Sequence, residues 1–361
     1  MKDRLFELVM VVMIAAATFA MTACGGADDD DDDDDDDSGY GDDDGGSDWR
    51  DAVPDPASLA LALPGEDNVP EKAPGELATL YHATVDYTRE VNAHIMYYLS
   101  SIDEITSYPP TEETSDAATW GPWIEDGLSP VEMQFVIERV SDEHYSYRLD
   151  WRPKTGGDWV TVWTGEVETS VETERRGVGQ FTIDFTAAWE LDPTINERGT
   201  IEVDYDTLTD GRLITISAIE FCGDENDADN DSVPCPTNAV YEYHNRADNS
   251  GYFEFDYWDD VHYNEYAGAE YAAYEHVWFN TRWESDGTGR SDVIITDGDI
   301  PNIVEDEYQL VSYTGSECWA SDFLRGYYIE EANFDPAYSY VVLEEGDDTM
   351  CAFEADPPDV D

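Results

Sequence analysis

The sequence predicts a mainly β fold, an antiparallel meander of about a dozen strands that forms a curved sheet or a barrel, with one long N-terminal amphipathic helix packed against it. Alternating or aromatic-rich runs fill the chain after residue 130, and turn residues such as Asp210-Gly211 and Asp286-Gly287 separate them. A single long stretch with helical periodicity precedes these runs. No helix-length segment lies between them, which argues against a parallel α/β sheet.

Residues 1–23 have the pattern of a lipoprotein signal peptide. A weakly basic start precedes an apolar run from Leu8 to Ala20, which is shorter than the ~18 residues expected of a membrane-spanning helix. The run ends in Met21-Thr22-Ala23-Cys24, which resembles the lipobox of bacterial lipoproteins, with Met21 where leucine is usual. This resemblance implies cleavage before a diacylated Cys24. An ordinary secretory peptide is the alternative.

Residues 24–75 are expected to be the lipidated cysteine and an acidic, disordered tether. The tract Asp28–Asp37 and the prolines between residues 54 and 74 leave too little apolar surface for this segment to fold by itself. Like charges extend such a chain, so the tether would hold the domain away from the membrane.

Residues 76–353 are expected to form the helix and the β domain, and the helix is predicted from Glu76 to about Ser107. Its apolar residues recur at steps of three and four and therefore share one face. Pro109-Pro110 ends it, because proline lacks the amide proton. The stripe consists of Leu77, Tyr81, Thr84, Thr88, Val91, Ile95, Tyr98, Ile102 and Ile105.

Short strands are expected through the rest of the domain, and residues 354–361 are expected to be a disordered tail. Gly179–Phe185, Gly199–Tyr205 and Gly251–Tyr257 each begin with a turn glycine and continue with apolar and polar residues in alternation, as in a strand with one buried face. The predicted strands are 131–140, 144–151, 158–168, 179–187, 199–206, 212–220, 238–244, 251–258, 272–284, 291–297, 307–314 and 338–343.

The chain is strongly acidic, with 85 acidic against 17 basic residues and a formal net charge of −68. Such a surface repels nucleic acid and anionic lipid headgroups, so we predict that neither is a partner. The expected membrane association is through the lipid anchor. The sequence does not identify a protein or glycan partner.

The five cysteines support an exported protein. If Cys24 carries lipid, Cys222, Cys235, Cys318 and Cys351 remain as an even set that can oxidise outside the cytoplasm. Four cysteines allow three pairings. Local loop closure favours Cys222–Cys235 with Cys318–Cys351 and leaves the other two pairings open.

The loop between Cys222 and Cys235 contains the clearest candidate metal site, although the aspartate tract 28–37 could also collect calcium. Asp227, Asp229 and Asp231 alternate at a spacing that lets carboxylates converge on Ca²⁺. The loop resembles the calcium loops of EF-hand-like and thrombospondin-type repeats, but Ser232 and Asn238 replace the glycine and the closing glutamate. We therefore predict no cofactor, with Ca²⁺ at these aspartates as the alternative.

Recognised catalytic motifs are absent, since the chain contains no H-E-x-x-H, no G-x-S-x-G, no phosphate-binding glycine loop and no C-x-x-C. Aromatic residues are abundant, most densely at Tyr252–Trp258 and Tyr271–Trp283. They are expected to build the core. If exposed they could stack on sugars, and if they enclosed a pocket they could line it for an apolar ligand.

Several phrases resemble a family of uncharacterised β-rich lipoproteins from myxobacteria and related Gram-negative bacteria. They include Gly179–Phe185, Asn238–Tyr241, Arg282-Trp283 and Ser316–Trp319, and the likeness spans roughly residues 85–353. It implies an N-terminal lipid anchor, a β-rich body and a Cys318–Cys351 bridge, but no molecular function. A curved sheet over a helix also resembles the periplasmic lipoprotein carriers, in architecture alone.

We therefore expect a non-catalytic cell-envelope lipoprotein with a binding or structural role. Gly25 after the lipidated cysteine favours the outer membrane, with the domain on the periplasmic or cell-surface side. One alternative is a carrier that holds a lipid or another apolar ligand in the concave side of the sheet. The other is carbohydrate binding through exposed aromatics, for which Tyr252, Tyr257 and Trp258 would have to be accessible.

Overall fold

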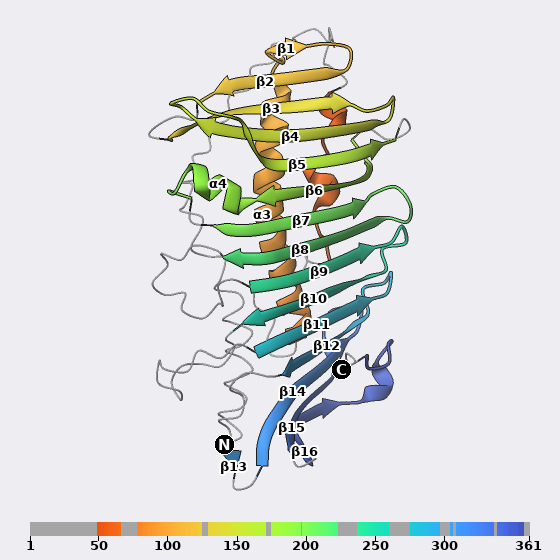
Figure 1. Ribbon diagram of the computed structural model, residues 1–361. Helices are drawn as coiled ribbons and strands as arrows, with labels where there is room; N and C mark the ends of the chain where they lie inside the picture. The colour runs from red at the N-terminus through yellow and green to blue at the C-terminus, as the bar shows by residue number, and fades with distance from the viewer. Residues whose placement is uncertain are drawn as a thin grey trace, which may run out of the picture.

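The computed structural model describes residues 49–65, 78–124, 129–170, 175–195, 197–222, 237–259, 275–296, 304–305, 308–335 and 338–356. Within these ranges the chain forms one long antiparallel sheet, with a long helix running along it (Figure 1).

The sheet is a meander in which fifteen strands follow one another in chain order, while the short strand β13 pairs with β14 beside this path. The strands are β1 (Glu112–Glu113), β2 (Ala117–Trp123), β3 (Val131–Arg139), β4 (His144–Pro153), β5 (Val160–Thr169), β6 (Gly177–Asp184), β7 (Arg198–Asp206), β8 (Arg212–Cys222), β9 (Thr237–Asn245), β10 (Gly251–Asp259), β11 (Glu275–Trp283), β12 (Gly289–Thr296), β13 (Val304–Glu305), β14 (Tyr308–Trp319), β15 (Arg325–Asp335) and β16 (Tyr338–Gly346).

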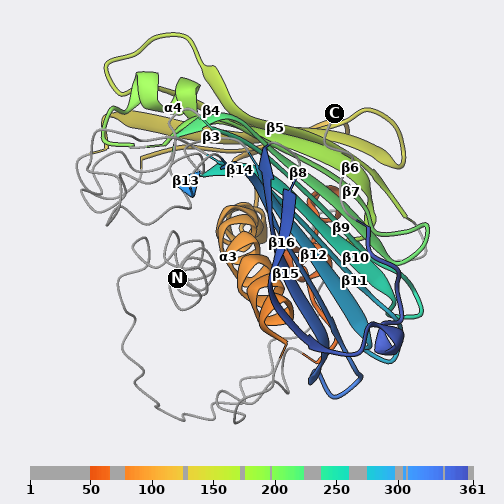
Figure 2. The ribbon, with the colours of Figure 1, turned by 90° about the horizontal axis from the view of Figure 1, so that it is seen from below.

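The predicted mainly β, antiparallel class is confirmed, whereas the barrel, one of the two predicted forms of the sheet, and the N-terminal position of the helix are wrong. The sheet is not a barrel, because its described strands run from an edge at β1 to an edge at β16 without closing. The long helix is α3 (Thr79–Ser107), and it is not N-terminal, because η1 (Arg50–Ala52) and α2 (Pro56–Leu59) precede it. These elements lie inside the curve of the sheet, which wraps around them instead of closing on itself (Figure 2).

All twelve predicted strands are present, with boundaries that differ by a few residues, but two longer strands were missed. Strand β2 contains Pro122, which cannot donate a ladder hydrogen bond. Strand β15 has an irregular register between Glu330 and Glu331, which breaks the alternation of its sequence. The predicted strand 179–187 instead stops at Asp184, whose side chain accepts a 2.8 Å hydrogen bond from the Ala187 amide and caps helix α4 (Phe185–Leu191).

Helix α3 lies on the concave face and crosses the strands, so that each turn meets a different part of the sheet (Figure 2). Near its N-terminus the Thr84 hydroxyl lies 2.6 Å from that of Thr281 on β11. The Tyr87 ring packs on Phe255 of β10 at 4.9 Å between centroids. Further along, Tyr98 meets Trp163 of β5 at 6.4 Å. The predicted stripe therefore faces the sheet.

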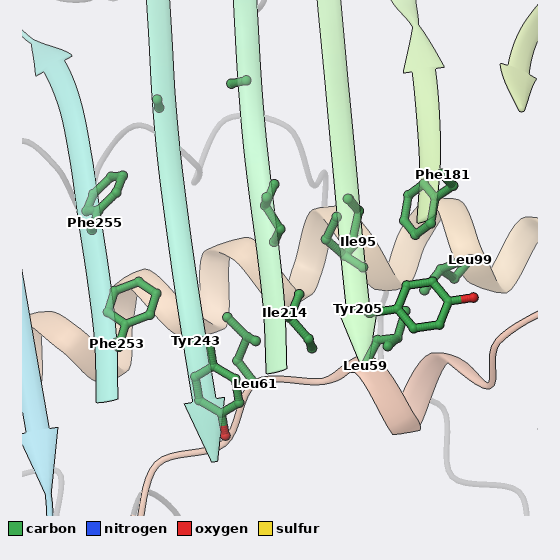
Figure 3. Packing of buried hydrophobic residues seen from close by; sticks show 14 of the residues in the cluster. Leu59, Leu61, Ile95, Leu99, Phe181, Tyr205, Ile214, Tyr243, Phe253 and Phe255 are labelled. Atoms are coloured by element: carbon green, nitrogen blue, oxygen red, sulfur yellow. The ribbon is translucent and has the colours of Figure 1, made fainter. Parts of the chain in front are cut away.

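The core fills the layer between α3 and the concave face (Figure 3). Alternation along each strand sends every second side chain into this layer, as with Phe253 and Phe255 of β10. Neighbouring strands add residues in register, such as Tyr243 opposite Phe253. Burying a large apolar side chain contributes roughly 1.5–3 kcal/mol, so this continuous layer is the main favourable term in folding.

The expected disordered tether does not extend to residue 75, because residues 49–63 belong to the core. Trp49, Leu59 and Leu61 are buried against the helix and the sheet. The Asn92 side chain of α3 accepts from the Leu61 amide at 2.6 Å and donates to the Leu61 carbonyl at 2.7 Å. These few apolar residues are stabilised by a surface that folds around them, which composition by itself does not reveal. Residues 24–48 and 66–75 lie outside the described residues.

The N-terminus of α3 is fixed to the sheet by Glu317 of β14, which is 0% exposed. The residue before the helix, Ala78, has no capping side chain. The Glu317 carboxylate accepts from the Leu80 amide at 2.5 Å and from the Arg325 guanidinium at 2.6 Å. Arg325 also donates to the Thr79 hydroxyl at 2.6 Å. A carboxylate here satisfies free helix amides and suits the positive end of the helix dipole.

We predict that Glu317→Gln lowers the free energy of unfolding by about 3 kcal/mol, because it leaves Arg325 without its buried counter-charge. Urea denaturation of the variant and the wild type measures the loss. The control is Glu202→Gln, the same change at an exposed site on β7, for which a change within about 0.5 kcal/mol is expected. Equal losses in the two variants would show that Glu317 does not hold the helix.

Candidate functional site

The convex face of the sheet carries its polar side chains in rows, because residues in register on neighbouring strands point to the same side. One row runs from β8 to β12 and is acidic. It consists of Thr215, Glu242, Glu254, Asn280 and Asp292. The row beside it contains the basic and aromatic side chains. It consists of His244, Tyr252, Arg282, Arg290 and Cys318.

These rows form the floor of a pocket of about 260 Å³ over β9, β10 and β11. The turn between β9 and β10 supplies one wall with Arg246 and Ser250, and Glu284 after β11 adds to another. Gly251 lies at the base, where a Cβ atom would come within 2.0 Å of the His244 carbonyl oxygen. Glycine is therefore required at this position.

The C-terminal segment 347–356 closes the remaining side of the pocket with Phe353 and Asp356. The predicted Cys318–Cys351 disulfide is confirmed, with its Cα atoms 5.5 Å apart, and it attaches this segment to β14. Arg282 donates to the Asp356 carboxylate at 3.2 Å and to the Glu354 carbonyl at 2.9 Å. The expected disordered tail 354–361 is therefore wrong for residues 354–356, and residues 357–361 lie outside the described part.

One acid of the convex face is fully compensated. Asp292 is buried, accepts from Arg282 at 3.0 Å and from Arg290 at 2.9 Å, and receives the Ser316 hydroxyl at 2.5 Å. The Asp356 amide approaches the same carboxylate at 3.3 Å. This network fixes the Arg282 guanidinium at the edge of the pocket.

Two other acids, Glu242 and Glu254, form no ion pair with a basic side chain within the described chain. Glu242 and Glu254 lie directly opposite each other on β9 and β10, where like charges destabilise a sheet. Glu242 accepts a short hydrogen bond from the Tyr252 hydroxyl. Glu254 is half-buried and has no hydrogen-bond or ion-pair partner within the described chain. Burial raises the pKa of Glu254, and the charges of Glu242 and Asp356 add to this increase.

Asn280 is a further unsatisfied group of the floor, and the Nε atom of Arg282 is another. The Asn280 side chain is only 2% exposed, and its Oδ1 atom has no hydrogen-bond partner among the described residues. It lines the pocket and stands in register between Glu254 and Asp292. A buried polar atom without a partner costs about 1–3 kcal/mol, so its retention requires an explanation.

Two aromatic rings flank the floor, each with a guanidinium over one face. Arg246 lies 5.9 Å from the Tyr252 ring centre, and Arg282 lies 5.4 Å from that of Phe353. The pocket thus combines hydrogen-bond acceptors in its floor with two rings at its sides, an arrangement suited to a small ligand that donates hydrogen bonds.

Most of the sites predicted from sequence lie outside the described residues. These are Cys24, Cys235 and the candidate calcium ligands Asp227, Asp229 and Asp231. Cys222 is described, is buried and is disulfide-bonded. Within the described residues, no group of three or more His, Cys, Asp or Glu side chains is placed to hold a metal ion.

The three aromatics proposed for sugar stacking do not share a surface. Tyr257 points into the concave core and is 8% exposed. Tyr252 and Trp258 point to the convex side, but Glu254 and Asp256 separate them along β10. Trp258 is 39% exposed, and its ring stacks on His276 at 4.9 Å between centroids.

No helix in the described ranges combines the length and the apolar character needed to cross a lipid bilayer. Comparison with known proteins finds no matching family model, no matching curated protein and no matching solved structure. The function must therefore be argued from the geometry of the site.

The sequence did not single out Glu242, Glu254, Asn280 or Asp356. Alternation within Gly251–Tyr257 does place Glu254 on the solvent-facing side of its strand, but alternation places many other acids on the solvent-facing sides of their strands as well. The signal that distinguishes these residues is the register that aligns β9, β10 and β11, together with the return of the C-terminal segment.

We predict that Glu254→Gln is more stable than the wild type at neutral pH. A carboxyl whose pKa is raised by folding adds stability below its unfolded pKa, about 4.3, and loses that contribution as the pH rises through its folded pKa. The two proteins should therefore have similar stability in acid and diverge as the pH rises. Urea denaturation across this range tests this, and a difference that shrinks with rising pH would contradict it.

Proposed function

We propose that this chain is a non-catalytic binding lipoprotein of the bacterial cell envelope and that its convex-face pocket holds a small polar ligand. The observation that carries the proposal is Asn280, a buried side chain that lines the pocket beside the unpaired Glu254 and whose Oδ1 atom has no hydrogen-bond partner among the described residues. A ligand that donates hydrogen bonds would satisfy both groups. Without a ligand, the sheet retains the free-energy cost of a buried oxygen that has no partner, which a leucine at position 280 would remove.

The envelope location rests on the N-terminal sequence. Lipid on Cys24 would anchor the chain in the outer membrane, and the acidic residues 28–37 would keep the domain away from the lipid surface. The disulfide between Cys318 and Cys351 supports an oxidising compartment. With a formal net charge of −68, the protein would repel nucleic acid and anionic headgroups.

The carrier alternative has less support. The centre of the concave face is covered by α3 and by residues 56–64 (Figures 2 and 3). Tyr243 of β9 bonds to both backbone groups of Ala62, at 3.0 and 2.7 Å. Arg212 of β8 donates to the carbonyl of Ala60. An apolar ligand at this position would have to displace these contacts.

The carbohydrate alternative loses its expected aromatic strip, since Tyr257 is turned away from Tyr252 and Trp258. Sugar hydroxyls could still donate to Glu254 and Asn280, so a sugar belongs among the ligands to be tested. A sugar differs from cationic donors in that it carries no charge.

We predict that Asn280→Leu raises the free energy of unfolding by about 1 kcal/mol and abolishes ligand binding, because it removes a buried group without a partner. Saturation-transfer NMR with glucose, glutamate and 1,4-diaminobutane as probes detects binding to the wild type and its loss. Thr215→Val, in the same row outside the pocket, is the control for losing a polar group. A destabilised Asn280→Leu that binds the probes unchanged would make Asn280 purely structural.

We predict that the mature protein begins at Cys24 with acyl chains attached and is found in the membrane fraction. Mass spectrometry of the native protein measures both features. Cys24→Ser should appear in the soluble fraction, because it lacks the acceptor thiol. An intact, unacylated N-terminus in the wild type would refute the anchor.

A further inference from the structure

The convex-face pocket carries a net negative charge. Four carboxylates line it against two guanidinium groups, which leaves a formal charge of −2. The carboxylates are Glu242, Glu254, Glu284 and Asp356, and the guanidinium groups are Arg246 and Arg282.

The positive groups are engaged with other partners, although the Nε atom of Arg282 has no hydrogen-bond partner among the described residues. Arg282 donates to Asp292 and Asp356 and lies over the Phe353 ring. Arg246 lies over the Tyr252 ring. The charge of Arg282 acts to lower the pKa of Glu254, but burial and the neighbouring carboxylates outweigh it where Glu254 faces Glu242 across the strand pair. The charge deficit of the pocket is therefore concentrated on its floor.

The acidic row of the floor presents hydrogen-bond acceptors in the same place. Glu242 and Glu254 offer only acceptor oxygens when ionised, and the free atom of Asn280 is also an oxygen. Residues 242, 254 and 280 occupy one cross-strand row, so their neighbouring Cβ atoms lie about 5 Å apart. A ligand must supply both positive charge and several N–H or O–H donors to satisfy this row.

We propose that the pocket recognises a protonated aliphatic amine, whose ammonium group donates to Glu254, Glu242 and Asn280 while its alkyl chain lies between Tyr252 and Phe353. This inference rests on the proposed function of the same pocket. An ammonium has three donors and no acceptor, which matches a floor of three acceptors. An anion would meet uncompensated carboxylates, and a neutral sugar would leave the charge of −2 in place.

Proton linkage follows from this geometry. Burial and the neighbouring carboxylates raise the pKa of Glu254, and an ammonium against it favours the ionised form. Amine binding should therefore release a proton from Glu254 at acid pH and strengthen as the pH rises through the folded pKa of this carboxyl.

Calorimetry on the full chain tests the inference with 1,4-diaminobutane as the probe. Its matched neutral isostere is 1,4-butanediol, and glucose and Ca²⁺ are the competing classes. Measurements at about 150 mM salt screen the general attraction of an acidic protein for cations. Glu254→Gln is the test variant, and Glu202→Gln removes the same charge from the convex face outside the pocket.

The expected result is diamine binding that Glu254→Gln weakens about tenfold or more, that Glu202→Gln leaves unchanged, and that the diol does not reproduce. Equal weakening in the two variants would reveal non-specific attraction and overturn the inference. Binding of Ca²⁺ that displaces the diamine would also overturn it. Circular dichroism of each variant establishes that it is folded.

Two outcomes separate this inference from the proposed function. If the diol or glucose binds in an Asn280-dependent manner and the diamine does not, the amine class is wrong and the pocket remains a binding site. If no probe responds to either Glu254→Gln or Asn280→Leu, the amine inference and the binding function both fail.

Discussion

The bond between Glu317 and the first turn of α3 determines where the helix lies on the sheet. The carboxylate comes from β14, near one end of the meander, and it meets helix amides that have no other cap. At the other end of the helix, Asp103 pairs with Arg50 and with Arg175, at 2.9 and 2.5 Å. Burial works against ionisation of Asp103, but the hydrogen bonds and charges of the two arginines lower its pKa overall. Because the helix is anchored at both ends, it holds strands that are far apart in the sheet at fixed positions relative to one another. The curvature of the convex face depends on this anchoring.

An acidic chain with few cations must distribute those cations selectively. Four arginines lie beside acids that are buried on folding: Arg325 at Glu317, Arg282 and Arg290 at Asp292, and Arg148 at Asp150. Asp150 also accepts from Gln134 and Thr161. Exposed acids need no such partner, because water solvates them. Glu254 belongs to neither group, since it is half-buried and unpaired. This contrast makes the convex-face pocket the most informative surface of the molecule.

Much of the fold could be predicted because alternation and helical period are local properties. The alternation of apolar and polar residues within Gly251–Tyr257 predicts a strand, and the stripe from Tyr81 to Ile102 predicts which face of α3 is buried. Properties that depend on distant partners could not be read in this way. The burial of Trp49 and Leu61 requires a sheet formed by residues far along the chain. The pocket likewise requires the register of β9 with β10 and β11 and the return of Asp356.

The disulfide-bonded C-terminal segment bears on when the pocket is completed after synthesis. Phe353 and Asp356 follow every strand of the pocket floor in the chain, and the covalent link that positions them spans 33 residues and forms only where thiols oxidise. A newly made chain in the reducing cytosol has the strands of the pocket floor but lacks the link that secures its last wall. For the exported binding protein that we propose, the pocket would therefore be completed only after export.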